Sequence, residues 1–174
     1  MSEEELILNR LLTCTIANGY AGVDEFKAYA RVHPEAALRI AWTVVTGRED
    51  PGRDDGALCV ELLETVTEAA GRQAVEELVL GGWPCLSDPI RRNIVVVAGS
   101  AKAMSAELAI KLFNHPETRT EQRHRIVAGL AAEDSRPGRE GYVVDLAKRI
   151  GSYSDPDRQA TLDRFVSSVV RNYS

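Results

Sequence analysis

The stretch SDPIRRNIVVVAGSAKAMSAELAIKLFNHP, residues 87–116, is the longest continuously apolar part of the chain, so the core is expected to form around it. Read as helices, this stretch begins with Asp88 as a cap and Pro89 in the first helical position. Spacings of four and three place its apolar side chains on one helical face: Ile90, Ile94 and Val97. This pattern predicts an all-α fold.

A strand is the alternative interpretation of the same stretch. Residues 94–97 would then run into Gly99 and Ser100 and a following helix, as in the phosphate-binding turn of an α/β protein. The placement of proline favours helices, because proline is tolerated in the first helical turn but breaks helix interiors and central strands. Six prolines stand just before or at the start of a helical pattern: Pro34, Pro51, Pro89, Pro116, Pro137 and Pro156.

Helical periodicity extends over most of the chain. Ser2 and Glu5 have the spacing of a capping box, as do Thr118 and Glu121, and Asp24 is expected to cap a short helix. The clearest apolar stripes are Leu38, Ala41, Trp42 and Val45; Cys59, Leu62, Leu63, Val66 and Ala70; and Leu162, Phe165, Val166 and Val169. We therefore expect nine or ten helices, arranged as an irregular α-solenoid or a compact multi-helix bundle.

Length and composition bound the class of protein. A chain of 174 residues suits a single domain, expected here to cover residues 1–174, and is long enough to form a core without metal or disulfides. Its three cysteines, Cys14, Cys59 and Cys85, are widely spaced and odd in number, which favours reduced thiols in the cytoplasm. No segment reaches the apolar length of a membrane span, so no membrane association is predicted.

Two recurring phrases suggest a repeat. SDPIR at 87–91 recurs as SDPDR at 154–158, and HPE at 33–35 recurs at 115–117, each at an expected helix start. A polar cap, a proline and a nearby arginine before an apolar helix resemble the turns of HEAT-like helical repeats. That resemblance implies antiparallel helix pairs stacked into a short solenoid whose concave side receives a protein or, in some families, a nucleic acid. A shared way of starting helices also explains the phrases, because the spacing of the prolines is irregular.

Known catalytic and metal-binding patterns do not match this sequence. Ser100 lacks the flanking pattern of a nucleophile elbow, and residues 99–102 lack that of a P-loop. Glu121 and His124 have the spacing of one half of a di-iron site, but no second copy of that motif is present. We predict no catalytic residue, no metal site and no cofactor. A helical enzyme remains the third functional hypothesis, since catalytic groups can converge from distant positions.

Charge is distributed unevenly along the chain, and this asymmetry supplies the leading functional hypothesis. Residues 1–86 carry 7 Lys and Arg against 15 Asp and Glu, whereas residues 87–174 carry 14 against 11. An acidic surface steers basic partners toward itself. We therefore expect a non-enzymatic protein-interaction module, a helical scaffold or adaptor, which binds its partner through acidic residues of the N-terminal half: Glu61, Glu64, Glu68, Glu76 and Glu77.

The alternative is binding of a nucleic-acid backbone through the basic C-terminal half. The residues that would carry it are Arg91, Arg92, Arg119, Arg123 and Arg125. Interleaved acidic residues and the lack of nearby aromatic side chains for base stacking argue against it, and ion pairs on solvated helix faces explain the same residues. The sequence does not specify an oligomeric state.

Overall fold

The computed structural model describes residues 2–15, 20–47, 55–98 and 106–126, together with positions 156, 159, 160, 163, 164 and 167. Its elements are α1 (Glu3–Thr13), α2 (Val23–Val32), α3 (Pro34–Gly47), α4 (Asp55–Ala70), α5 (Arg72–Gly82), the 3-10 helix η2 (Trp83–Cys85), α6 (Asp88–Ala98) and α7 (Ala106–Asn114). No strand occurs among the described residues, so the predicted all-α class is confirmed. The described residues hold these eight elements and a further helical stretch that begins at residue 120, and the total of nine or ten helices stays a prediction.

The valine-rich part of the fold-deciding stretch is helical. Helix α6 runs through it from Asp88 to Ala98, which makes the strand interpretation wrong. Ile90 and Ile94, two of the three residues predicted for the inward face, are buried together with Val95. The burial of the third, Val97, lies outside what the structure describes. The helix begins at Asp88, one residue earlier than predicted, and the backbone N–H of Arg91 donates to the Ser87 carbonyl at 2.9 Å.

The chain forms two compact units, Met1–Val97 and Ala98–Ser174. The first unit holds α1 to α5, η2 and nearly all of α6. The expectation of a single domain over the whole chain stays a prediction.

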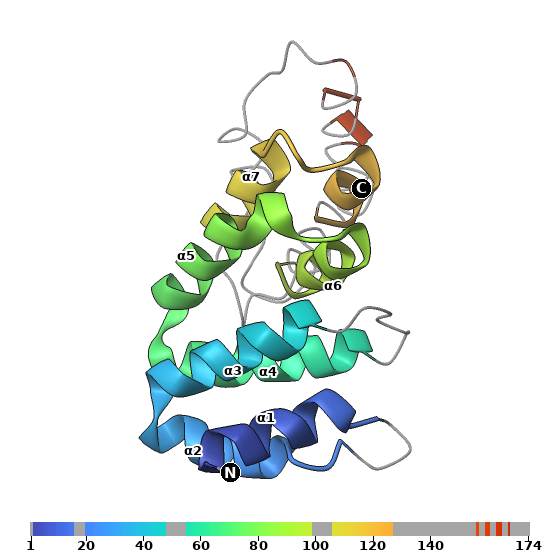
Figure 1. The fold of residues 1–174 in the computed structure, drawn as a ribbon. Coiled ribbons are helices and arrows are strands. Elements are labelled where there is room, and N and C mark those ends of the chain that lie inside the picture. Colours follow the sequence, from blue (N-terminus) through green and yellow to red (C-terminus); the bar gives the residue numbers. More distant parts are fainter. Residues whose placement is uncertain are drawn as a thin grey trace. The chain divides into compact units, whose positions relative to one another are not determined.

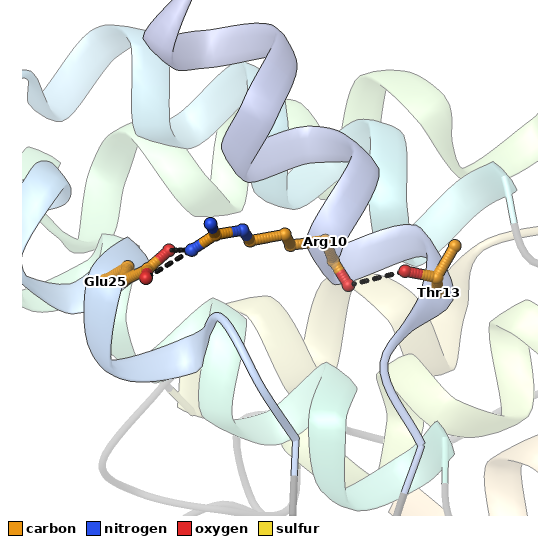
Figure 2. Close-up of polar contacts among 3 residues, drawn as sticks. All are labelled: Arg10, Thr13 and Glu25. Carbon is orange, nitrogen blue, oxygen red and sulfur yellow. Dashed lines mark hydrogen bonds and ion pairs between the residues drawn. The ribbon is translucent and has the colours of Figure 1, made fainter. Parts of the chain in front are cut away.

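Helices α1 and α2 form an antiparallel pair. Arg10, near the end of α1, forms an ion pair with Glu25 at the start of α2, as Figure 2 shows. At the other end of the pair, the Tyr29 hydroxyl donates to Glu4 at 3.1 Å. Gly22 stands at the turn that enters α2, with φ of +100°, and a Cβ added to it would lie 3.1 Å from the Cβ of Arg10. A side chain at this position would be strained, which is why the turn uses glycine.

Helices α3 and α4 form a second layer on the first (Figure 1). Helix α1 packs on α3 and runs in the same direction, because Glu4 pairs with Arg39 at 3.7 Å while Leu12 lies beside Gly47. Helix α2 packs on α4 in the same manner. Corresponding helices of consecutive pairs therefore stack in parallel within the first unit.

The core of this unit is built mainly from small and branched apolar side chains, with Phe26 and Trp83 as its largest fully buried members. Helix α4 buries Cys59, Leu62, Leu63 and Val66, four of the five residues of the predicted stripe, while the fifth, Ala70, is half-buried. In α3 the stripe is wider than predicted, since Ala37, Ile40 and Val44 are buried while Leu38 and Trp42 are half-buried. The wider stripe follows from the position of α3, which contacts α1, α2 and α4.

Some predicted helix boundaries are confirmed and others are shifted. The capping box of Ser2 and Glu5 is present, with hydrogen bonds of 3.2 and 2.7 Å between each backbone N–H and the other side chain. Asp24 does not cap α2, because Gly22 precedes the helix and Asp24 lies within its first turn. The predicted stripe of Leu162, Phe165, Val166 and Val169 lies outside the described residues.

In the second unit, α7 is followed by a helical stretch that begins at residue 120. The capping box predicted for Thr118 and Glu121 is wrong, because the residue before the helix is one position later than Thr118. Thr118 instead donates its hydroxyl to the Leu112 carbonyl at 2.6 Å, which satisfies an acceptor in the last turn of α7. The residue before the helix is Arg119, whose N–H donates to the Gln122 side chain at 3.0 Å.

Among the residues that the structure describes, no helix combines the length and apolar character needed to cross a membrane.

Candidate functional site: the face shared by α2 and α4

The face that α2 and α4 share is organised around an ion pair. Lys27 projects from the middle of α2 and Glu61 from α4, and the two side chains form an ion pair although they remain 38% and 43% exposed. The hydrogen bond from Lys27 to Glu61 is the largest cause that raises the pKa of Lys27 above its ordinary value. The lysine therefore stays protonated and partly offsets the Glu61 charge.

One pocket lies beside this ion pair, where α2 and α4 begin. We call it the Asp24 pocket; its volume is about 260 Å³. Its lining residues are Tyr20, Val23, Asp24, Ala57, Leu58 and Glu61. The pocket thus combines an apolar wall with two carboxylates.

A second pocket lies farther along the same two helices. We call it the Glu68 pocket; its volume is about 290 Å³. Its lining residues are Lys27, Ala30, Arg31, Thr65, Glu68 and Ala69. Both cationic and acidic side chains line it, so its charge is mixed. Residue numbers rise along α2 and α4 from the first pocket to the second, as expected for two parallel helices.

The structure separates the five predicted partner-binding glutamates. Glu61 and Glu68 line the two pockets on the α2–α4 face, whereas Glu64, also on α4, is half-buried. Glu76 and Glu77 lie on α5 and line neither pocket; Glu77 accepts a 2.8 Å hydrogen bond from Gln73. The sequence prediction thus places two of its residues on this face.

Two of the five predicted nucleic-acid-binding arginines are buried. Arg91 is 5% exposed and donates to the carbonyls of Trp83 and Pro84 at 3.1 and 3.0 Å. Its guanidinium also lies 5.5 Å from the centre of the Trp83 ring, within the range of a cation–π interaction. Trp83 itself is fully buried.

Arg123 is likewise buried and bound to backbone carbonyls, in the second unit. It is 6% exposed and donates to the carbonyls of Phe113 and His115 at 2.9 and 3.4 Å. Arg91 and Arg123 each occupy the fourth position of a helix and bind carbonyls at the end of the preceding helical element. Their guanidinium groups satisfy helix-end acceptors, so they do not form an exposed basic surface.

The other three predicted arginines are exposed: Arg92, Arg119 and Arg125. Arg92 belongs to the first unit and the other two to the second. Arg125 pairs with Glu121 at 3.2 Å, one helical turn away, which is the ordinary ion pair of a solvated helix face. The phosphate-binding interpretation therefore rests on fewer arginines than the sequence suggested.

In the described part of the chain, no group of three or more histidine, cysteine or acidic side chains is arranged to hold a metal ion. The three cysteines are thiols; Cys14 and Cys59 are buried, and Cys85 is exposed.

Sequence reasoning missed the α2 contribution to this face. Lys27 and Arg31 were not singled out, and Asp24 was interpreted only as a helix cap. The acidic and basic residues of α2 gave no signal of their role, because the pairing of α2 with α4 joins positions more than thirty residues apart. Comparisons of the chain with models of protein families, with curated proteins and with solved structures find no match.

Proposed function

We propose that this chain is a non-enzymatic protein-interaction module, a helical scaffold or adaptor, that binds a basic segment of a partner protein on the α2–α4 face. The observation that carries the proposal is the position of Asp24, Glu61 and Glu68, which come from two adjacent helices and line pockets on both sides of one ion pair. Carboxylates beside apolar hollows are suited to steering and then holding basic side chains.

The stacked helix pairs of the first unit support the scaffold part of the proposal. In solenoids of the HEAT-like kind, each pair contacts mainly its neighbours, and equivalent helices follow one another across an extended surface. The parallel packing of α1 on α3 and of α2 on α4 is compatible with such a stack. We extend the proposal to a short HEAT-like repeat acting in the cytoplasm, where its three cysteines would remain reduced.

The experiment is capture of partners by the immobilised full chain, followed by their identification by mass spectrometry. The test variant is the double charge reversal Glu61→Lys with Glu68→Lys. The matched control is Glu35→Lys, which reverses one exposed charge in the first turn of α3, away from both pockets.

The proposal expects the wild type and the control to capture the same proteins, enriched in basic segments, and the double variant to lose them. Recovery of those proteins by a folded double variant would contradict it. Circular dichroism of each variant distinguishes lost binding from lost structure.

A further inference from the structure

We infer that the Asp24 pocket is the specificity pocket of this face and receives one arginine side chain from the partner. This inference rests on the proposed function, since it assigns the partner residue that the α2–α4 face would recognise. It requires an arginine in the partner, whereas steering by charge alone requires only a basic partner.

The size of the pocket limits its occupant. Its volume of about 260 Å³ is below the roughly 300–1,000 Å³ typical of pockets that enclose small-molecule ligands and cofactors. A single long side chain is a better match to this volume. The pocket is also far larger than the roughly 30 Å³ that one water molecule occupies in the liquid.

The chemistry of the lining selects a long cationic side chain. Val23, Ala57 and Leu58 supply apolar surface against which an aliphatic stem can pack. Asp24 and Glu61 supply carboxylates from two different helices, and no cationic side chain is among the described residues that line the pocket. A guanidinium has donors on several edges and can bind two carboxylates, whereas a lysine ammonium is a compact point charge.

The Lys27–Glu61 ion pair is the internal competitor for this site. An entering arginine would share or replace Lys27 at Glu61, at little cost because both side chains of the pair are substantially exposed. Removing the Lys27 charge should therefore strengthen arginine binding. A pocket that merely attracts cations through the overall acidity of the protein would show little dependence on Asp24 in particular.

The test titrates the isotopically labelled full chain with N-acetyl-arginine amide and follows backbone amide signals by NMR. N-acetyl-citrulline amide, a neutral compound of almost the same shape, is the matched control ligand. We expect saturable shifts around residues 23–24 and 57–61 with a dissociation constant on the order of 1 mM, and no comparable shifts with the citrulline compound.

Three variants make the result specific. Asp24→Asn should weaken arginine binding by about tenfold, since it removes one of two charged acceptors. Lys27→Met should strengthen it by about threefold. Glu35→Gln, remote from the pocket, should leave it unchanged.

Absence of shifts at the pocket, equal shifts with the citrulline compound, or unchanged affinity in Asp24→Asn would overturn the inference. Its failure can be distinguished from failure of the proposed function. If arginine amide does not bind but partner capture still requires Glu61 and Glu68, the face binds its partner without this pocket. If the arginine compound binds as expected while capture is indifferent to charge reversal, the broader proposal fails instead.

Discussion

At the scale of single residues, the two buried arginines are the most informative side chains. Each one binds carbonyls that end the preceding helical element, and a lysine lacks the planar arrangement of donors needed to bind both. Arg91 also contacts the ring of Trp83, which links a polar helix end to the buried core. Both arginines therefore have a structural role.

Replacement of Arg91 tests that role. Arg91→Met should lower the free energy of unfolding by about 2–3 kcal/mol, because one buried and one partly buried carbonyl lose a charged donor. Arg92→Met, the exposed neighbour, should change it by less than about 0.5 kcal/mol. Chemical denaturation followed by tryptophan fluorescence measures both. Equal effects of the two substitutions would show that the carbonyl contacts of Arg91 contribute nothing.

Tyr29 should make the stability of the protein depend on pH in the alkaline range. Burial of its ring and, next, its hydrogen bond to Glu4 raise the pKa of the Tyr29 hydroxyl above its ordinary value. A raised pKa means that the neutral phenol is favoured in the folded state. Its stabilising contribution is therefore complete below the ordinary tyrosine pKa of about 10 and is lost as the pH rises through the folded-state value.

The measurement compares wild type with Tyr29→Phe across alkaline pH. Groups that titrate in both proteins cancel in the difference between their free energies of unfolding. That difference should decline above about pH 10, where the unfolded tyrosine ionises. A difference that stays constant or grows with pH would contradict the assigned environment of Tyr29.

At the scale of elements, the end of α5 depends on close packing against α3. A Cβ atom added to Gly82 would overlap the Trp42 ring, whereas one added to Gly81 would meet no atom within 4 Å. Two adjacent glycines in the same helix end thus have opposite tolerances. The contact of Gly82 with Trp42 joins positions forty residues apart, so local sequence patterns could not assign it.

Alanine substitutions separate the two positions. Gly82→Ala should destabilise the protein by about 1–3 kcal/mol, because the half-buried Trp42 ring must move to make room for the added methyl group. Gly81→Ala should stabilise it by about 0.5–1 kcal/mol, because alanine is the better helix former and fits in open space. Thermal unfolding of both variants measures the contrast. A stabilised Gly82→Ala protein would show that the α3–α5 contact is looser than described.

The helices themselves were largely predictable from apolar periodicity and proline placement. The stripe of α4, the start of α3 at Pro34 and the helical state of the valine-rich stretch all follow from local spacing. The start of α2 was not predictable in the same way, since Gly22 caps it through a left-handed backbone conformation. Asp24 has the type of side chain that usually caps a helix. The capping residue is Gly22 instead, because α1 approaches this position closely at Arg10 and leaves no room for a side chain.

The candidate site was less predictable, because its contacts join distant positions. The acidic residues of α4 were visible in the sequence, but Lys27 became relevant only when α2 packed beside α4. The buried arginines were misinterpreted for a related reason. Their acceptors are backbone carbonyls seven to ten residues earlier, and carbonyls have no sequence signature.

At the scale of the whole molecule, the net charge predicts that partner binding depends on the salt concentration. The chain carries a formal net charge of −5, with the excess of acidic residues in its first 86 positions. Attraction between exposed charges is screened over about 10 Å at 0.1 M salt. Association driven by the α2–α4 face should therefore weaken as salt is added, mainly through a slower association rate.

We propose above that acidic side chains of the α2–α4 face bind a basic partner. The salt dependence of association with the protein identified by capture tests this most directly. The rate and affinity are measured by surface plasmon resonance for wild type and for Glu61→Lys with Glu68→Lys. We expect wild-type binding to weaken with salt and double-variant binding to be weak at every salt concentration. Equal affinities and equal salt dependence for the two proteins, both correctly folded, would contradict it.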